Sequence, residues 1–230
     1  KYEEALHVIV AAEKQVVGVF GKKKALYANC LFNHGVTFYL MNRYTDAKPL
    51  YLEAKTIQEK VLGKEHPDYA KTLNNIAILY YIMGQYEKAE LFYLETKTIR
   101  EKVLGNEHPD YAKTLSNISV LYKDMGKYEN AESFSLEAKS IRGKVLGMNH
   151  PDYAASLNNL AILYCDMGKY ESAETLYLEA LSIYEKVLGK EDPDYAQSLN
   201  NLAILYWHMG EYDKAESFYL EAISINEKVL

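Results

Sequence analysis

The feature that most constrains the fold is a block of sequence that returns every 42 residues. It reads EHPDYAKTLNNIAILYYIMG at 65–84, and close copies occupy 107–126, 149–168 and 191–210. Every copy ends in a glycine, the first at Gly84 and the last at Gly210. A fixed period of this length is typical of proteins that stack one supersecondary unit on the next, because a single unit cannot bury its apolar side alone.

Each repeat contains two segments with the apolar spacing of an α-helix. In residues 151–167 the apolar positions recur every three or four residues, and Gly168 then favours a helix end. A second apolar stripe runs through 170–188 and is followed by another glycine. The small residues Ala161, Ala173 and Ala180 lie where two helices would have to approach closely. We therefore predict that each repeat is an antiparallel helix pair and that successive pairs stack.

The same register extends toward both ends of the chain. Tyrosine recurs every 42 residues from Tyr2 to Tyr212. Residues 25–41 are therefore interpreted as a degenerate first helix, with Asn42 in place of the glycine, since asparagine also tolerates a left-handed helix end. Both ends of the chain cut through the pattern, and we expect the chain to be a segment of a longer protein.

The predicted fold is all-α: a right-handed α-solenoid, or superhelix, of stacked antiparallel helix pairs with about 11 helices. We expect one continuous solenoid over residues 1–230. Its predicted parts, in chain order, are the second helix of a partial, degenerate repeat with its connection (1–24), a degenerate repeat (25–66), three regular repeats (67–108, 109–150 and 151–192) and a truncated last repeat (193–230).

Composition and charge exclude several classes of function. No run approaches the roughly 20 apolar residues that a membrane-spanning helix needs. The formal net charge of −6 argues against nucleic acid as the main partner. Cys30 and Cys165 occupy different repeat positions, so we expect no disulfide, which fits a reducing compartment such as the cytoplasm.

The tripeptide His66-Pro67-Asp68 recurs at the start of the first helices and could be a catalytic or metal-binding motif. Proline suits the first helical position, however, and aspartate in the first turn interacts favourably with the helix dipole. In one copy aspartate, a good N-cap residue, replaces the histidine. Stacked helices lie about 8–10 Å apart, too far for these histidines to share one ion at ligand distances of about 2 Å. We interpret the tripeptide as a helix start. We expect no catalytic residues, no cofactor and no metal.

The segment NLAILYCDMGKYESAETLYLEALSI at 159–183 resembles a tetratricopeptide repeat. The signature spacings of that family fall on Ala161, Tyr164, Gly168, Tyr170, Ala173, Tyr177 and Ala180. The period of 42 exceeds the usual one of about 34, and the longer pattern LG..HPD.A..LNNLA.LY...G.Y..AE is similar to the repeats of kinesin light chains. The resemblance is strong over 67–230 and weak over 1–66. It implies a solenoid whose concave groove binds a partner protein.

One asparagine occupies the same position in every repeat, and the residue before it is polar in four of five. Asparagine is a mediocre helix former, and these residues lie off the apolar stripe of their helix. The candidates are Asn33, Asn74, Asn75, Asn117, Asn158, Asn159, Asn200 and Asn201. An amide side chain offers donors and an acceptor that match a peptide backbone, and the resemblance implies that these amides hold a peptide in the groove. The alternative is that each amide bonds a neighbouring helix and only braces the superhelix.

Specificity would come from groove positions that differ between repeats. Near the helix start the candidates are Lys71 and Lys113, and beyond the asparagines they are Tyr39, Tyr81, Lys123, Asp124, Asp166, Trp207 and His208. A buried aromatic anchor with polar rim contacts is what a peptide hot spot requires. The alternative is that Tyr81 and Trp207 pack against the next repeat.

Taken together, these patterns predict a non-enzymatic protein-interaction scaffold. Its concave groove would take an extended or helical peptide of a partner protein, as an adaptor module similar to kinesin light chains would. A second possibility is the regulatory arm of a larger enzyme, such as a caspase-like protease or a nucleotide-binding signalling ATPase. A third is a structural spacer whose groove is empty. Neither nucleic acid nor a membrane is an expected partner.

Overall fold

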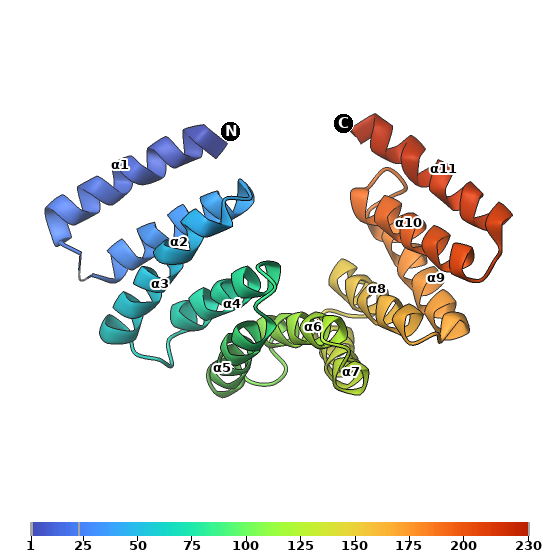
Figure 1. Ribbon diagram of the computed structural model, residues 1–230, viewed down its shortest axis with the longest axis horizontal. Coiled ribbons are helices and arrows are strands. Elements are labelled where there is room, and N and C mark those ends of the chain that lie inside the picture. The colour runs from blue at the N-terminus through green and yellow to red at the C-terminus, as the bar shows by residue number, and fades with distance from the viewer. Residues whose placement is uncertain (1, 23, 230) are drawn as a thin grey trace. The chain divides into compact units, whose positions relative to one another are not determined.

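The computed structural model describes residues 2–22 and 24–229, and these form eleven α-helices and no β-strand (Figure 1). This confirms the prediction of an all-α fold. The chain divides into two compact units, residues 1–106 and residues 107–230. We call them the first unit and the second unit and describe each by itself.

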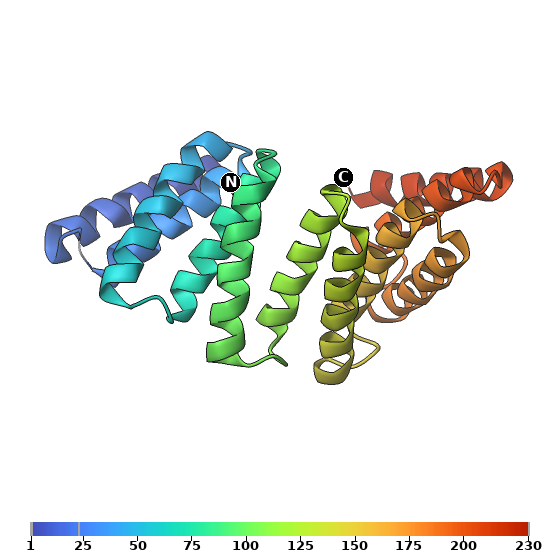
Figure 2. The ribbon, with the colours of Figure 1, turned by 60° about the horizontal axis from the view of Figure 1, so that its bottom comes forward.

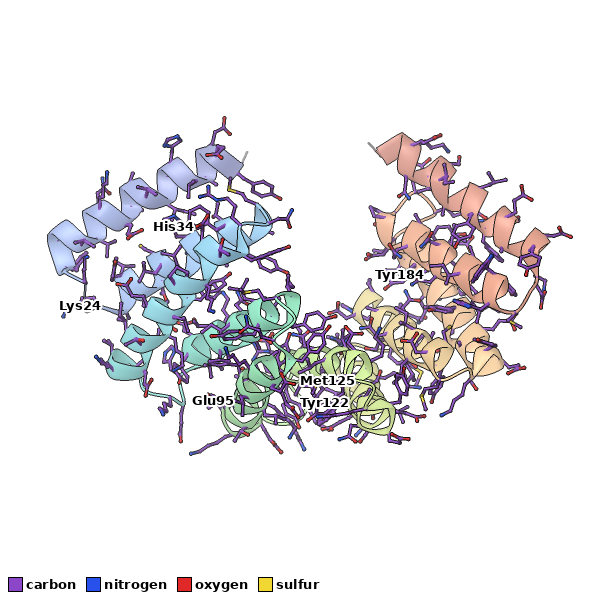
Figure 3. The ribbon with its side chains drawn as sticks, viewed as in Figure 1. Lys24, His34, Glu95, Tyr122, Met125 and Tyr184 are labelled. Carbon is purple, nitrogen blue, oxygen red and sulfur yellow. The ribbon has the colours of Figure 1, made fainter. Side chains whose placement is uncertain are left out.

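The first unit contains α1 (Tyr2–Phe20), α2 (Ala25–Leu40), α3 (Tyr44–Val61), α4 (Pro67–Ile82) and α5 (Tyr86–Leu104). Helix α2 pairs with α3, and α4 pairs with α5. The pairs stack because α3 packs on α4, while α1 packs on α2. His34 of α2, labelled in Figure 3, bonds Glu13 of α1 with 3.1 Å between Nδ1 and Oε2.

The second unit contains α6 (Pro109–Asp124), α7 (Tyr128–Val145), α8 (Pro151–Asp166), α9 (Tyr170–Val187), α10 (Pro193–His208) and α11 (Tyr212–Val229). The pairs are α6 with α7, α8 with α9, and α10 with α11. Successive pairs stack through α7 on α8 and α9 on α10, as Figure 2 shows, and the first helices also contact one another, α6 with α8 and α8 with α10. The stacking of helix pairs predicted from the repeat is therefore present in both units.

The recurring tripeptide forms the start of the first helices, as interpreted from the sequence. The Nδ1 atom of His66 accepts a hydrogen bond from the backbone N–H of Asp68 at 3.1 Å, and His108 and His150 make the same bond. In the fourth copy Asp192 accepts from the N–H of Asp194 at 2.8 Å. Each bond satisfies one of the backbone N–H groups that a helix leaves unpaired at its first turn.

The helix ends also follow the prediction. Gly168 has a φ of 72°, in the left-handed region, and Asn42 occupies the same region with a φ of 58° at the position where the degenerate repeat lacks glycine. A side chain at Gly168 would have open space, because no atom lies within 4 Å of the Cβ position. The glycine is therefore required by its backbone conformation and not by packing.

We expect the change Gly168→Ala to lower the free energy of unfolding by about 1–2 kcal/mol, the cost of a left-handed conformation for a residue with a Cβ. Gly168→Asn should cost less, because asparagine tolerates this conformation, as Asn42 does. Urea denaturation of the two variants and the parent chain measures both values. Equal stability of the alanine and asparagine variants would contradict this explanation.

A ladder of tyrosine–glutamate bonds joins the two helices of each pair. The hydroxyl of Tyr69 donates to Oε1 of Glu95 at 3.1 Å, and Glu95 is labelled in Figure 3. The two bonded residues are 26 positions apart, and the same bond recurs in every other pair, at Tyr27–Glu53, Tyr111–Glu137, Tyr153–Glu179 and Tyr195–Glu221. These tyrosines are buried, so the repeated aromatic and carboxylate positions are part of the scaffold.

Candidate functional site

The later asparagine of each repeat lies on the accessible side of a first helix. Asn33 is exposed and Asn75 is half-buried in the first unit, and Asn117, Asn159 and Asn201 are half-buried in the second. The residues one turn earlier share this side because positions four apart meet on a helix surface; they are Asn29, Lys71, Lys113, Ala155 and Gln197. We call this side of the first helices the amide face.

The earlier residue of each asparagine pair has a different environment. Asn74 and Asn158 are only 4% and 8% exposed, so these two candidates are buried and are not open to a peptide in the groove. Nδ2 of Asn158 donates to Oγ of Ser198 at 2.8 Å, which ties α8 to α10. The first helices contact each other as well as their partners, and their buried arc is therefore wider than the apolar stripe. Burial of Asn74 and Asn158 fits the alternative that these amides brace the superhelix. The corresponding Asn200 is half-buried.

Amides on the amide face make direct bonds within each unit. Nδ2 of Asn75 donates to the hydroxyl of Tyr51 at 3.4 Å, and Oδ1 of Asn201 accepts from Gln197 at 3.1 Å. An amide has two N–H donors and a carbonyl acceptor. Each of these bonds uses only part of that capacity, so the same side chains can brace the scaffold and still bond a ligand.

The aromatic candidates pack within their own repeat in the first unit. The ring centroid of Tyr39 lies 5.7 Å from that of Tyr44, and the Tyr81 and Tyr86 centroids are 5.9 Å apart. Each of these pairs joins the end of a first helix to the start of its partner. Tyr39 and Tyr81 are half-buried, so each offers part of a ring to a ligand.

The second unit carries the most exposed aromatic ring among the candidates. Trp207 is 57% exposed and meets His208 edge-on, with 5.1 Å between the ring centroids. His208 in turn stacks on Tyr170 at 6.3 Å. The indole is therefore supported from one side and open on the other.

A charged cluster links two first helices of the second unit. Nζ of Lys123 lies 3.0 Å from Asp124 and 3.4 Å from Asp166 on the next first helix. Partial burial lowers the pKa of Lys123, but the carboxylates of Asp124 and Asp166 raise it by more, so the pKa lies above its usual value. The charge of this lysine is balanced within the protein, which makes it a poor site for an acidic peptide.

Sequence reasoning missed a row of buried polar residues on the second helices. Gln58, Arg100, Arg142 and Tyr184 occupy the same repeat position, and they are 1%, 6%, 9% and 3% exposed. Tyr184 is labelled in Figure 3. The signal was present, because a polar or charged residue interrupts the apolar stripe at this position in TIQEK, TIREK, SIRGK and SIYEK.

Arg142 shows what this buried position does. Its guanidinium donates to Oγ of Ser116 on α6 at 3.1 Å and to Oγ of Ser156 on α8 at 2.6 Å. Burial lowers the pKa of Arg142, and the nearby carboxylate of Asp152 partly opposes this. One side chain of a second helix therefore bridges two first helices.

Asn33 and Lys71 of the first unit come together at a pocket between α2 and α4, which is also lined by Gln58 of α3. Among the described residues, no group of three histidine, cysteine, aspartate or glutamate side chains is arranged to hold a metal ion. None of the helices in the described ranges is long and apolar enough to cross a membrane.

The sequence was compared with protein-family profiles and with curated proteins. A family profile described as tetratricopeptide repeat matches residues 39–102, 110–186 and 152–228. A search of curated proteins found no match.

Several solved structures share the fold. BtubC (BKLC) from P. vanneervenii is 23% identical with a TM-score of 0.79, over 100% of this chain and 91% of that one. A variant of a Podosopora anserina putative kinesin light chain with nearly identical TPR-like repeats is 24% identical with a TM-score of 0.74, over 87% and 95% of the two chains. The Rap conjugation gene regulator of plasmid pLS20, solved with the Phr* peptide, is 18% identical with a TM-score of 0.72, over 89% of this chain and 55% of that one.

Proposed function

Because the chain belongs to the tetratricopeptide repeat family, we propose that it is a protein-interaction scaffold whose amide face binds an extended or helical segment of a partner protein. The observation that carries this proposal is the row of asparagines at one helix position, of which Asn117, Asn159 and Asn201 lie on successive first helices of the second unit. Neutral amides supply neither a nucleophile nor an acid–base group, whereas a row of them matches the repeating donors and acceptors of a peptide backbone.

The spacing of the row suits a peptide. An extended chain advances about 3.3 Å per residue, and neighbouring helices lie about 8–10 Å apart. Each asparagine would therefore bond about every third residue of the ligand without reading its sequence. In the second unit the exposed ring of Trp207 would supply an apolar anchor, and the Lys123–Asp166 pair would supply a polar rim.

Two further observations support this function. The Rap regulator, a protein with the same fold, was solved with a peptide, and the likeness to a putative kinesin light chain is consistent with an adaptor module. Both cysteines are free thiols, which supports a reducing compartment such as the cytoplasm.

We expect peptides selected on the immobilised chain from a random phage-displayed library to lose about 10- to 1,000-fold in affinity when Asn117, Asn159 and Asn201 are all changed to alanine. Each lost hydrogen bond contributes about 0.5–1.5 kcal/mol, and a factor of 10 corresponds to about 1.4 kcal/mol. Fluorescence anisotropy with the synthetic peptides measures the dissociation constants. Circular dichroism and urea denaturation establish that the variant is folded.

The matched control changes three exposed asparagines of the same unit that lie off the amide face, Asn130, Asn149 and Asn226, to alanine. Its affinity should equal that of the parent chain. If no peptide is selected, or if the two triple variants bind equally well, the amide face is not a peptide site and its asparagines only brace the helices.

A further inference from the structure

The first unit has a pocket of about 150 Å³ that opens on the amide face between α2 and α4. It is lined by Asn29, Phe32, Asn33, Gln58, Asp68, Lys71 and Thr72. Gln58 is 1% exposed, and its Oε1 atom accepts no hydrogen bond from the described residues. A buried acceptor without a donor is costly and calls for a bonding partner. The pocket is therefore incomplete without a ligand or ordered water.

The repeat register shows which group fits this pocket, because the same place is filled in the second unit. The positions two repeats, or 84 residues, earlier in the chain correspond as follows: Gln58 to Arg142, Phe32 to Ser116 and Thr72 to Ser156. In the second unit the guanidinium of Arg142 occupies the space between Ser116 and Ser156. In the first unit the shorter Gln58 stops before that space.

The pocket retains one of the two hydroxyl groups that hold the guanidinium of Arg142, because Thr72 stands in the place of Ser156. Oγ of Ser156 donates to the backbone carbonyl of Asp152 and so presents a lone pair to the arginine. Thr72 makes the same bond to the carbonyl of Asp68 at 3.0 Å, and no arginine among the described residues stands where Arg142 meets Ser156.

Two more features of the pocket attract a planar cation. Asp68 lines the pocket at the repeat position of Asp152, whose carboxylate offsets the charge of Arg142 in the second unit. The ring of Phe32 offers a face for cation–π stacking, which Nζ of Lys71 already uses at 4.8 Å from the ring centroid. The volume is sufficient, since a cavity of about 150 Å³ in another protein accommodates benzene, which is larger than a guanidinium group.

We propose that this pocket is a binding subsite for the guanidinium group of an arginine side chain in a partner peptide. The inference deepens the proposed function and rests on it for the source of the arginine. The bound guanidinium would donate to Gln58 Oε1 and Thr72 Oγ1, pair with Asp68 and stack on Phe32. Lys71 would give up its place over the ring and move toward solvent, since its side chain is exposed.

The test titrates the whole chain with N-acetyl-L-arginine N-methylamide and follows its backbone and side-chain amide resonances by NMR. We expect saturable shifts at the Gln58 side-chain amide and at Thr72 and Asn33. The citrulline analogue of the probe has the same shape without the charge, and it should bind at least about tenfold more weakly, because hydrogen bonds to charged groups are roughly twice as strong as neutral ones.

Three variants sharpen the result. Gln58→Arg should abolish the shifts, because it supplies the chain's own guanidinium as Arg142 does. Asp68→Asn should weaken binding about tenfold. Lys71→Ala, which copies Ala155 beside Arg142, should strengthen binding a few-fold by removing a like charge and opening the ring of Phe32.

The proposal is overturned if neither the parent chain nor Lys71→Ala shows saturable shifts, if the citrulline probe binds as well as the arginine probe, or if Gln58→Arg binds like the parent. Tighter binding of free arginine than of the capped probe would assign the pocket to the amino acid and overturn the peptide assignment. The test needs no partner protein, so its failure and the failure of the asparagine experiment are distinguishable.

Discussion

Raising the pH from 9 to 12 should lower the free energy of unfolding steeply, because buried tyrosines are held in their protonated form. Tyr51 and Tyr184 are 1% and 3% exposed, and burial raises the pKa of each from about 10 to about 12. The carboxylate of Asp194 further raises the pKa of Tyr184, and the hydrogen bond from Asn158 opposes it. The hydrogen bond from Asn75 opposes the rise in the pKa of Tyr51. Between pH 10 and 12 the unfolded chain therefore releases protons that the folded chain retains.

The sign follows from this difference in bound protons. Stability is fully present below pH 10, the unfolded pKa, and falls as pH rises toward the folded value. One pKa unit corresponds to 1.36 kcal/mol, so each of these two tyrosines should contribute a loss of about 2–3 kcal/mol by pH 12. The two together approach the total stability of many domains, about 5–15 kcal/mol. We expect alkaline unfolding within this window.

Urea denaturation, followed by circular dichroism at a series of pH values, measures how steeply the free energy of unfolding falls with pH. Tyr51→Phe and Tyr184→Phe should each make the decline above pH 10 shallower, and the double variant should show the smallest decline. Tyr212→Phe is the control, because this ring is 64% exposed and its removal should leave the slope unchanged. Lysines titrate in all variants alike, so a slope unaffected by the buried substitutions would refute the assignment to tyrosine.

The features that the sequence predicted correctly depend on local rules. Helix starts at His66-Pro67-Asp68 and helix ends at Gly168 or Asn42 are set by the backbone conformation of a few adjacent residues. The pairing of helices follows from apolar spacing within one repeat and the close approach at Ala161, which is fully buried. Because most copies of the repeat carry the same or equivalent residues at these positions, the helix bounds and the pairing of helices could be predicted throughout the chain.

The candidate site was only partly predictable, because its decisive contacts lie between repeats. Asn158 and Asn159 are adjacent and chemically identical, yet the first is buried against Ser198 and the second is half-exposed. An amide suits either environment, since it can bond a neighbouring helix or a ligand. Only the packing of one first helix on the next decides between them, and apolar spacing within a helix does not report that packing.

Buried polar residues were missed for a related reason. Charged residues are rarely fully buried unless they are paired, so Arg142 in the apolar stripe of α7 reads from the sequence as a surface residue. Its burial is made possible by Ser116 and Ser156, which belong to two other helices. The partner set is visible only when three helices are assembled.

Replacing Arg142 with tyrosine should lower the free energy of unfolding by about 2–3 kcal/mol, although tyrosine occupies the same position in the next repeat. The change removes the two hydrogen bonds that Ser116 and Ser156 accept from the guanidinium, although each hydroxyl still donates to a backbone carbonyl. A hydrogen bond to a charged group contributes about 1.5–3 kcal/mol. Urea denaturation of the single variant measures the loss.

The loss should be largely recovered by a second change, Ser116→Asn, because it completes the arrangement of the following repeat. There Tyr184 hydrogen-bonds to Asn158, and Asn158 donates to Ser198; in the double variant Ser156 takes the place of Ser198. We expect the double variant to lie within about 1 kcal/mol of the parent, which gives a coupling energy in the range seen for residues in contact. Additive losses would show that the two buried networks are not interchangeable. Recovery would mean that the bridging residue of a repeat and its hydrogen-bond partners are interchangeable only as a set. Gln58, whose Oε1 atom accepts no hydrogen bond from the described residues, does not complete such a set.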